Sequence, residues 1–561
     1  TCVCEVNKLE RRFYMVPAQV LPEVFLKVVR AKELLASGEA RSISAATRAV
    51  DLSRSAFYKY KDCIFDSEND REVHLNVFNN IAFGLKLKKL QHRDHQPVHA
   101  GKRGCPCGGD HPHRYHADDP GGADREALPP AHGGGRALRV QSVTEGEGTQ
   151  MAKIAILGFG TVGSGVYEVL CRNAAGVSRR AGEPVEVKYI LDPKDFSGHP
   201  AANLFVKSID TILQDPEVRV VVETIGGTRF AYPYVKACLE SGRSVCTSNK
   251  EMVATYGAEL LGLAKAHDCA FLFEASVGGG TPIITPMHQC LAANVISEVE
   301  GIVNGTTNFM LTNMVRENLS FDDALKVAQE LGYAETKDPS DDVDGRDACR
   351  KIAILSSMVC GHQIYPQNIP TRGIRAITTA DVEAAEKLGC VIKLIAWMKL
   401  GKDGSVAAGV EPCLVPRANQ LASVDDVFNA VLVKGDMLGD VVFYGKGAGK
   451  LPTASAVVAD VVDALKHGSK VHDSLFWQPA EPVDGMLTDP TPAAYYVRVA
   501  GIAPAVAEAI YGYGKVVDER YDGCSYFVER ADEKALAEAA RKVEAMGGSV
   551  KLVLKRLPEE A

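Results

Sequence analysis

A short apolar run that leads directly into a glycine-rich turn and a helix limits what this chain can fold into. The run Lys153–Leu157 is followed by the turn Gly158-Phe159-Gly160-Thr161-Val162-Gly163, and Val162–Arg172 has the spacing of an amphipathic helix. Gly158 permits the sharp turn, Gly160 lets the backbone approach a pyrophosphate, and Gly163 lets the helix pack closely on the strand. This arrangement predicts a dinucleotide-binding α/β domain.

Further strands and helices alternate after this turn. Val185–Leu191 and Val218–Glu223 are short apolar runs, as expected for strands buried in a parallel sheet, so we predict a doubly wound Rossmann-type domain over residues 151–280. Asp192 follows the second strand and could bond a ribose hydroxyl of NAD, whereas Lys194 could hold the 2′-phosphate of NADP. The sequence leaves the choice of cofactor open.

Two later segments fall where ligands of open α/β sheets collect. Lys250 follows the predicted strand Ser244–Cys246 and therefore lies at a carboxyl end of the sheet, although a plain surface lysine would fit equally well. Glu274 precedes a glycine-rich bend that ends at Pro282. The carbonyls of this bend are free to face a monovalent cation or the cofactor, and an interdomain hinge is the alternative.

The stretch from Leu331 to Lys351 is dense in carboxylates and runs into a helix. Asp347 and Lys351 are four residues apart on this helix, so their side chains share one face. The simplest explanation is an exposed salt bridge. The chemical alternative is an acid/base lysine beside a carboxylate, because hydride transfer to a carbonyl leaves an alkoxide that needs a nearby cation and a proton. With the dinucleotide turn, this alternative indicates a dehydrogenase.

Together these motifs resemble the homoserine dehydrogenase family over about Met151–Leu557. The resemblance implies reversible NAD(P)H-dependent reduction of L-aspartate 4-semialdehyde to L-homoserine, on the route to threonine, methionine and isoleucine. It also implies a homodimer or a larger homo-oligomer and a catalytic domain over residues 281–474. The segments that carry it are the glycine turn, Thr247–Lys250, Glu274–Pro282, Asn304–Asn308 and Leu331–Lys351.

The resemblance also implies catalytic roles. Lys351 is the expected proton donor or acceptor with Lys250 close by, and Asp347 and Asp342 are expected to orient the reacting end of the substrate. Two neighbouring lysines should lower the pKa of one of them. Glu335 is expected to bind the substrate amino group. The segment Thr336-Lys337, between Glu335 and Asp338, is one residue longer than in some members of the family. Asp341 therefore remains an alternative to Asp342.

Binding roles follow from the resemblance in the same way. Sodium is expected at Glu274 and the backbone carbonyls of Val277, Gly279 and Thr281. The expected cofactor contacts are Gly158, Phe159, Gly160, Thr161, Val162, Gly163, Lys250 and, from a loop far along the chain, Gly449.

The carboxy-terminal segment, residues 475–561, has a strand-helix-strand-strand-helix-strand pattern that predicts a ferredoxin-like fold of the kind found in regulatory ACT domains. The stretch Gly501–Pro504 is short where an effector loop would lie. Inhibition by threonine is therefore a hypothesis.

The first 82 residues have a different pattern, with an apolar stripe over Leu21–Leu34 and a helix capped near Ser42. This part resembles the helix-turn-helix-like start of small bacterial ACT-domain proteins. A DNA-binding or amino-acid-responsive regulator fused by read-through is the alternative function. A helical hairpin that packs on a partner domain explains the pattern better, because one such motif is a weak signal.

Residues 83–150 are rich in His, Gly and Pro and have no sustained apolar period, which predicts a disordered linker. Cys105 and Cys107 with nearby histidines suggest zinc, but their spacing is tighter than usual. A one-base shift of codons that could encode Gln91–His99 gives a strand-like peptide, and a shift near Gly109–His116 gives another. We therefore hypothesise that this linker is an out-of-frame translation product.

Composition narrows the class of protein. The net charge of -8 does not favour nucleic acid or an anionic membrane as the main partner. There is no apolar run long enough to span a bilayer and no export signal, so we expect a cytoplasmic protein. Cysteines from Cys171 onward occur singly in apolar segments, and no disulfides are expected. Another amino-acid dehydrogenase, acting on a related aldehyde or oxo acid, is a further alternative.

Overall fold

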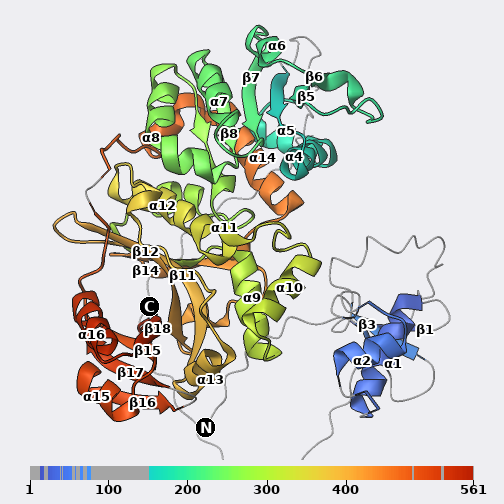
Figure 1. The fold of residues 1–561 in the computed structure, drawn as a ribbon. Helices are drawn as coiled ribbons and strands as arrows, with labels where there is room; N and C mark the ends of the chain where they lie inside the picture. The colour runs from blue at the N-terminus through green and yellow to red at the C-terminus, as the bar shows by residue number, and fades with distance from the viewer. Residues whose placement is uncertain are drawn as a thin grey trace, which may run out of the picture. The chain divides into compact units, whose positions relative to one another are not determined.

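The chain divides into two compact units, Thr1–Thr144 and Glu145–Ala561, which are described separately (Figure 1). The computed structural model describes residues 13–17, 23–37, 39–40, 42–53, 57, 64–66, 72–76, 151–482, 485–519 and 523–559.

The first unit contains helices α1 (Glu23–Ala36) and α2 (Ile43–Ala49). The Ser42 hydroxyl caps α2 by accepting the Ala45 N–H at 3.2 Å, as the sequence predicted. An antiparallel sheet of order β1-β3-β2 accompanies the helices, although the sequence indicated helices alone. Its strands are too short to show a convincing alternation. They are β1 (Phe13–Pro17), β2 (Ile64–Asp66) and β3 (Glu72–Asn76).

Several predictions for the amino-terminal part fall outside the described residues. They include most of the turn and second helix of the helix-turn-helix-like pattern, the whole of the linker 83–150 and the candidate zinc ligands.

A six-stranded parallel sheet of order β6-β5-β4-β7-β8-β9 forms the first part of the second unit. Strands β5 and β7 flank β4 on opposite sides, so the strand order reverses at β4, where ligands bind in such sheets. The strands are β4 (Ala152–Leu157), β5 (Val185–Leu191), β6 (Phe205–Val206), β7 (Val218–Glu223), β8 (Ser244–Thr247) and β9 (Phe271–Leu272).

Helices cover this sheet, and one of them comes from far along the chain. Helix α14 (Lys450–His467) contacts α4, β7 and β8 (Figure 1). Gly165 allows its close approach, because a Cβ there would lie 2.8 Å from the Lys450 carbonyl oxygen. The other helices are α4 (Thr161–Arg172), α5 (Ala174–Ala181), α6 (Ile209–Leu213), α7 (Ala231–Glu240) and α8 (Lys250–Ala266).

A second sheet lies in the part of the chain where the sequence predicts a catalytic domain. Its strands β10 (Ile296–Ile302), β11 (Cys390–Leu400), β12 (Val406–Pro416), β13 (Phe428–Gly435) and β14 (Gly439–Lys446) are antiparallel in the order β14-β13-β10-β11-β12. Helix α12 contacts β11 and β12 and also α8. The helices of this domain are α9 (Gly305–Arg316), α10 (Phe321–Glu330), α11 (Ser340–Val343), α12 (Arg346–Cys360) and α13 (Thr379–Lys387).

The carboxy-terminal segment has the element order βαββαβ and the sheet order β18-β15-β17-β16, with antiparallel neighbours. Strand β18 also pairs in parallel with β12, at Cys413 with Lys555 and Leu414 with Arg556. This pairing extends the catalytic sheet to nine strands, a continuity that the sequence did not indicate. The elements are β15 (Ala493–Ala500), α15 (Pro504–Tyr511), β16 (Gly514–Asp518), β17 (Gly523–Ala531), α16 (Glu533–Ala545) and β18 (Ser549–Arg556).

No helix among the described residues combines the length and the apolar character needed to cross a bilayer.

Candidate active site

The turn between β4 and α4 depends on two of its glycines. Gly158 has a φ of +91°, and a Cβ there would lie 3.0 Å from backbone atoms of Thr224. A Cβ at Gly163 would lie 2.0 Å from the Gly158 carbonyl oxygen. Gly160 is the N-cap of α4, and nothing lies within 4 Å of a Cβ built there. The turn therefore leaves open space at a helix N-terminus, which fits a dinucleotide pyrophosphate.

Phe159 packs against the segment that follows β5. Its ring packs edge-on against the rings of Phe196, His199 and Phe205, at centroid distances of 5.3, 5.2 and 5.1 Å. Its backbone N–H donates to Asp192 Oδ2 at 2.8 Å. The side chain and the backbone N–H therefore anchor the turn to the segment after β5, and the contact of Phe159 with a cofactor stays a prediction.

Asp192, at the end of β5, is buried and occupied by its own loop. Besides the Phe159 N–H, its carboxylate accepts the Lys194 N–H at 2.8 Å. The Lys207 ammonium donates to the carbonyl oxygens of Asp192, at 3.0 Å, and Pro193, at 3.3 Å. The Lys194 side chain is exposed. Each Asp192 oxygen thus accepts one backbone N–H, and the choice between Asp192 and Lys194 as the ribose contact stays a prediction.

Lys250 and Lys351 meet at one buried carboxylate. Lys250 begins α8, and its Nζ lies 3.0 Å from Asp347 Oδ1. Lys351 Nζ lies 2.7 Å from Asp347 Oδ2 and donates to the Val303 carbonyl oxygen at 2.6 Å. Asp347 is 4% exposed and Lys351 is 8% exposed, so the pair is not a solvent-exposed salt bridge. The structure therefore brings the predicted catalytic residues together.

The charges at this cluster set the pKa values of its members. Burial raises the pKa of Asp347, but the ammonium groups of Lys351 and Lys250 outweigh it and hold the pKa below its ordinary value. The Asp347 carboxylate in turn raises the pKa of Lys250, against the effect of burial. The expectation that two neighbouring lysines lower the pKa of one is therefore wrong for Lys250, because a carboxylate lies between them.

Asn304 also belongs to the site, although no role was predicted for it. Its Nδ2 donates to Asp342 Oδ1 at 2.7 Å and to Asp347 Oδ2 at 2.9 Å. Its Oδ1 accepts the Thr307 N–H at 2.9 Å and so caps α9. The one sign of this role in the sequence is that an asparagine stands just before the start of a helix. Asn304 thereby fixes the carboxylates of Asp342 and Asp347 relative to each other.

The geometry distinguishes Asp342 from Asp341. Asp341 is exposed and pairs with Arg350 at 2.7 Å, and it has no hydrogen bond to Asn304 or to either lysine among the described residues. Burial raises the pKa of Asp342, an effect that the Asn304 hydrogen bond reduces and the nearby Asp347 charge increases. Asp342 is thus the carboxyl that belongs to the cluster. Glu335 is exposed, and its backbone carbonyl accepts a hydrogen bond from the Gln329 side chain at 2.9 Å.

The bend that follows Glu274 uses this carboxylate internally. Glu274 is 5% exposed and accepts the N–H groups of Ile283, Ile284 and Thr285, at 2.7, 3.1 and 2.6 Å. These three bonds occupy the carboxylate that the sequence associated with a cation. The Thr281 hydroxyl is buried and has no hydrogen-bond partner among the described residues.

The loop before α14 lies against the same bend. The Gly280 N–H donates to the Lys446 carbonyl oxygen at 3.0 Å, and a Cβ at Gly279 would lie 2.4 Å from the Gly447 carbonyl oxygen. Gly449, the N-cap of α14, has a φ of +128°. Glycines on both sides therefore permit the close approach of the two loops.

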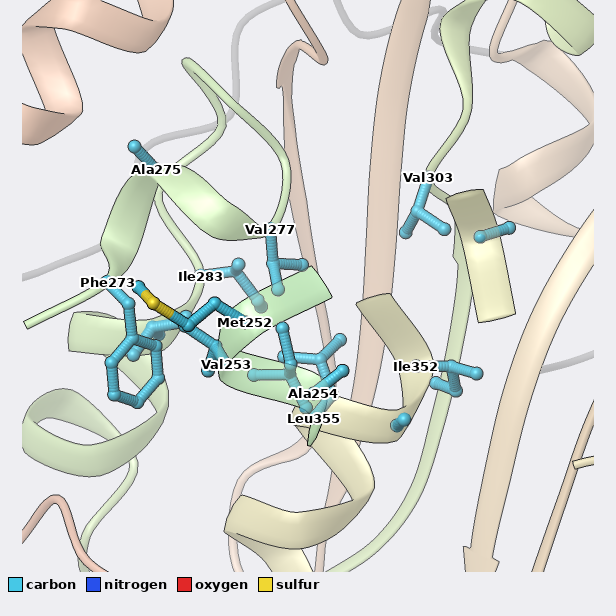
Figure 2. Packing of buried hydrophobic residues seen from close by; sticks show 14 of the residues in the cluster. Met252, Val253, Ala254, Phe273, Ala275, Val277, Ile283, Val303, Ile352 and Leu355 are labelled. Carbon is cyan, nitrogen blue, oxygen red and sulfur yellow. The ribbon is translucent and has the colours of Figure 1, made fainter. Parts of the chain in front are cut away.

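Apolar packing behind the lysines keeps α8 and α12 in place. Figure 2 shows Met252, Val253 and Ala254 of α8 in one apolar cluster with Ile283 and with Leu355 of α12. All five side chains are at most 1% exposed. Because cores of this kind are close-packed, the two helices that carry the lysines are held against each other with little freedom.

Comparisons with known proteins agree with this geometry. A family model described as "Homoserine dehydrogenase, NAD binding domain" matches residues 158–274, and one described as "Homoserine dehydrogenase" matches residues 282–462. The homoserine dehydrogenase of Bacillus subtilis is 40% identical over 320 residues, which are 56% of this chain and 73% of the relative. The chain belongs to the homoserine dehydrogenase family.

Other homoserine dehydrogenases extend the match. That of Neisseria gonorrhoeae is 40% identical over 356 residues, 62% of this chain and 81% of its own length. The crystal structure of the Thiobacillus denitrificans enzyme is 36% identical, has a TM-score of 0.67, and aligns over 73% of this chain and 99% of its own. The match confirms the prediction of an oxidoreductase with a Rossmann-type NAD-binding domain and a catalytic domain.

Proposed function

We propose that this homoserine dehydrogenase catalyses the reversible NAD(P)H-dependent reduction of L-aspartate 4-semialdehyde to L-homoserine. The observation that carries the proposal is the meeting of Lys250 and Lys351 at the buried Asp347. Lys250 comes from the end of the dinucleotide-binding sheet, and Lys351 comes from the catalytic domain. A nicotinamide bound at the turn after β4 supplies or accepts the hydride.

Lys351 is the residue proposed to move the proton. Reduction of an aldehyde makes its oxygen an alkoxide, which an ammonium group can stabilise and then protonate. Asp347 and the Val303 carbonyl each take one hydrogen of Lys351, at 2.7 and 2.6 Å, which leaves one N–H for the substrate oxygen. Lys250 adds a second positive charge on the other side of Asp347.

Asp342 and Glu335 are proposed to bind the rest of the substrate. Asp342 lies beside the lysine cluster, and its bond to Asn304 holds one carboxylate oxygen in place. Glu335 is exposed on the segment between α10 and α11, where its carboxylate could accept the substrate ammonium group. These two acidic side chains suit an amino-acid substrate better than a neutral aldehyde.

For the cofactor, we propose contacts with the backbone of Gly158–Gly163, with Lys250 and with Gly449. The open N-terminus of α4 supports the first of these. A sodium ion would use the carbonyls of Val277, Gly279 and Thr281, because the Glu274 carboxylate already accepts three N–H groups.

For the carboxy-terminal segment, we propose an ACT-like regulatory module. Its βαββαβ order and its sheet order β18-β15-β17-β16 support this proposal. A titration with threonine that changes neither the rate nor the stability would contradict regulation by that amino acid.

The deciding experiment follows NADH and NADPH oxidation at 340 nm with L-aspartate 4-semialdehyde. It compares the whole chain with a protein that begins at Met151, and a panel of other aldehydes and oxo acids serves as control. Turnover with aspartate semialdehyde by both proteins is expected. Activity only on another substrate, or none with either nicotinamide, would refute the proposal.

A further inference from the structure

A fully buried carboxylate lies at the carboxyl end of β7, next to the strand that leads to Lys250. Glu223 is the last residue of β7 and is 0% exposed. It pairs in register with Thr247, the last residue of β8. It is outside the residues assigned to catalysis above, and no cation pairs with it among the described residues. A buried carboxylate of this kind needs hydrogen-bond donors.

Three donors converge on the Glu223 carboxylate. Its Oε1 accepts the N–H groups of Ile225, at 2.7 Å, and Gly226, at 3.3 Å. Its Oε2 accepts the Thr247 hydroxyl at 2.5 Å. Burial raises the pKa of Glu223, and these hydrogen bonds act in the opposite direction. Both oxygens of the Glu223 carboxylate thus accept hydrogen bonds from the protein.

The hydrogen bonds continue from Glu223 to the start of α8. The Thr247 Oγ1 accepts the Asn249 N–H at 3.0 Å. Asn249 is the N-cap of α8, where its Oδ1 accepts the Met252 N–H at 3.1 Å. Its Nδ2 donates to the Gly227 carbonyl oxygen at 2.6 Å. The next residue is Lys250, so the network sets where the helix that carries this lysine begins.

The loop after β7 needs such support. Gly226 and Gly227 have φ angles of +80° and +64°, and nothing lies within 4 Å of a Cβ built at either residue. The space on the Cβ side of both glycines is therefore open. The carboxylate of Glu223 holds one side of the loop and the amide of Asn249 holds the other.

We propose that Glu223 is a positioning residue for the reaction, which acts through Thr247 and Asn249 to hold the Lys250 ammonium against Asp347. The proposal rests on the function assigned above only for its effect on rate. The position of Lys250 can be measured without turnover. A misplacement of about 1 Å in a catalytic group can cost on the order of 100-fold in rate.

The test uses the whole chain with E223Q, T247V, T247S and T255V. E223Q replaces one acceptor oxygen with a donor, and T247V removes the hydroxyl while keeping its volume. T247S keeps the hydroxyl. T255V is the matched control in α8, because the one bond of the Thr255 hydroxyl within the described part of the chain goes to the Glu251 carbonyl oxygen one turn earlier.

Two readouts are compared. The first is kcat and KM for aspartate semialdehyde, measured separately. The second is the rate at which trace acetic anhydride acetylates Lys250, followed by mass spectrometry. A lysine held by a carboxylate reacts slowly because its pKa is raised, as it is for Lys250. Loss of the Asp347 contact should therefore speed acetylation.

E223Q and T247V are expected to lower kcat about 10- to 100-fold, with KM changed less than about threefold, and to speed Lys250 acetylation several-fold. T247S and T255V should match the wild type in both readouts. The double variant E223Q/T247V should be no slower than the worse single variant, because both changes disrupt the same Glu223–Thr247 bond. Unchanged acetylation in E223Q and T247V, or equal losses in T247S and T247V, would overturn the proposal. An inactive wild type with the expected acetylation pattern would refute the proposed function alone.

Discussion

Asp347 and Glu300 are both buried carboxylates of the catalytic domain, yet their surroundings shift their pKa values in opposite directions. For Asp347 the two lysines outweigh burial and lower the pKa. For Glu300, burial and the neighbouring Glu298 charge raise the pKa to about 7. Burial alone therefore does not decide whether a carboxyl group is ionised at neutral pH. The nearest charges decide it.

The two lysines near Glu300 form ion pairs with the neighbouring Glu298. Lys434 Nζ lies 2.8 Å from Glu298, and Lys399 Nζ lies 3.4 Å from it. Glu300 Oε2 has no hydrogen-bond partner among the described residues. Glu300 and α12 lie on opposite faces of the sheet, because Glu300 alternates with Val299, which packs in the same core as α12 residues such as Ile352. One face of the sheet thus holds Asp347, whose negative charge is balanced by two lysines. The other face holds Glu300, which has no ion pair of its own among the described residues.

The largest effect is expected from Lys351→Ala, which removes the proposed proton donor and one of the two cations beside Asp347. We expect kcat to fall by about 1,000-fold, within the range for general acid catalysis, while nicotinamide binding is retained. Stopped-flow and fluorescence titration measure the two quantities. Retained turnover would show that the charge cluster of Asp347 does not carry the chemistry.

Asp347→Asn should reduce both activity and stability, because it leaves Lys250 and Lys351 without their common counter-charge. Removing one partner of a buried ion pair costs about 3 kcal/mol, which urea unfolding at pH 7 can detect. The folded-state pKa of Asp347 is lowered. Its stabilisation is therefore present above the ordinary carboxyl pKa of about 4 and is lost as the pH falls below it.

Asp341→Asn is the matched control for this change. Asp341 is an exposed carboxylate in the same turn that pairs with Arg350, and surface ion pairs contribute little to stability. An equal loss from both substitutions would mean that burial of Asp347 adds nothing.

Glu300→Gln should have a smaller effect than Asp347→Asn, and it should be a stabilising one. The folded-state pKa of Glu300 is raised to about 7, so the folded protein loses stability as the pH rises from the unfolded-state value toward 7. Gln has no such dependence, and the variant should gain about 2 kcal/mol at pH 8 relative to the wild type. Urea unfolding at pH 5 and pH 8 tests this expectation. An equal gain in stability at both pH values would contradict the prediction that the raised pKa of Glu300 lowers the stability of the folded protein.

Local pattern was enough to predict much of this structure. The glycine turn and the strands around it depend on neighbouring residues, and the structure has β4, β5, β7 and α4 within one residue of the ranges expected. The pairing of Asp347 with Lys351 follows from helical spacing alone.

Interactions between distant segments could not be predicted in this way. The bonds from Asn304 to Asp342 and Asp347 join residues about forty positions apart. The sequence likewise gave no sign that Glu274 would bind backbone N–H groups or that Asp192 would be occupied by its own loop. For Glu274 and Asp192 the residue type suggested a ligand contact, and the tertiary structure also places backbone N–H donors at both carboxylates.

The return of α14 to the dinucleotide-binding sheet has a consequence for synthesis. Helix α14 covers α4, β7 and β8, but it follows the whole catalytic domain in the chain. As the polypeptide leaves the ribosome, the domain that contains the glycine turn therefore waits for residues near His467 before its last layer can close. The catalytic domain is thus synthesised before the dinucleotide-binding domain receives its last helix.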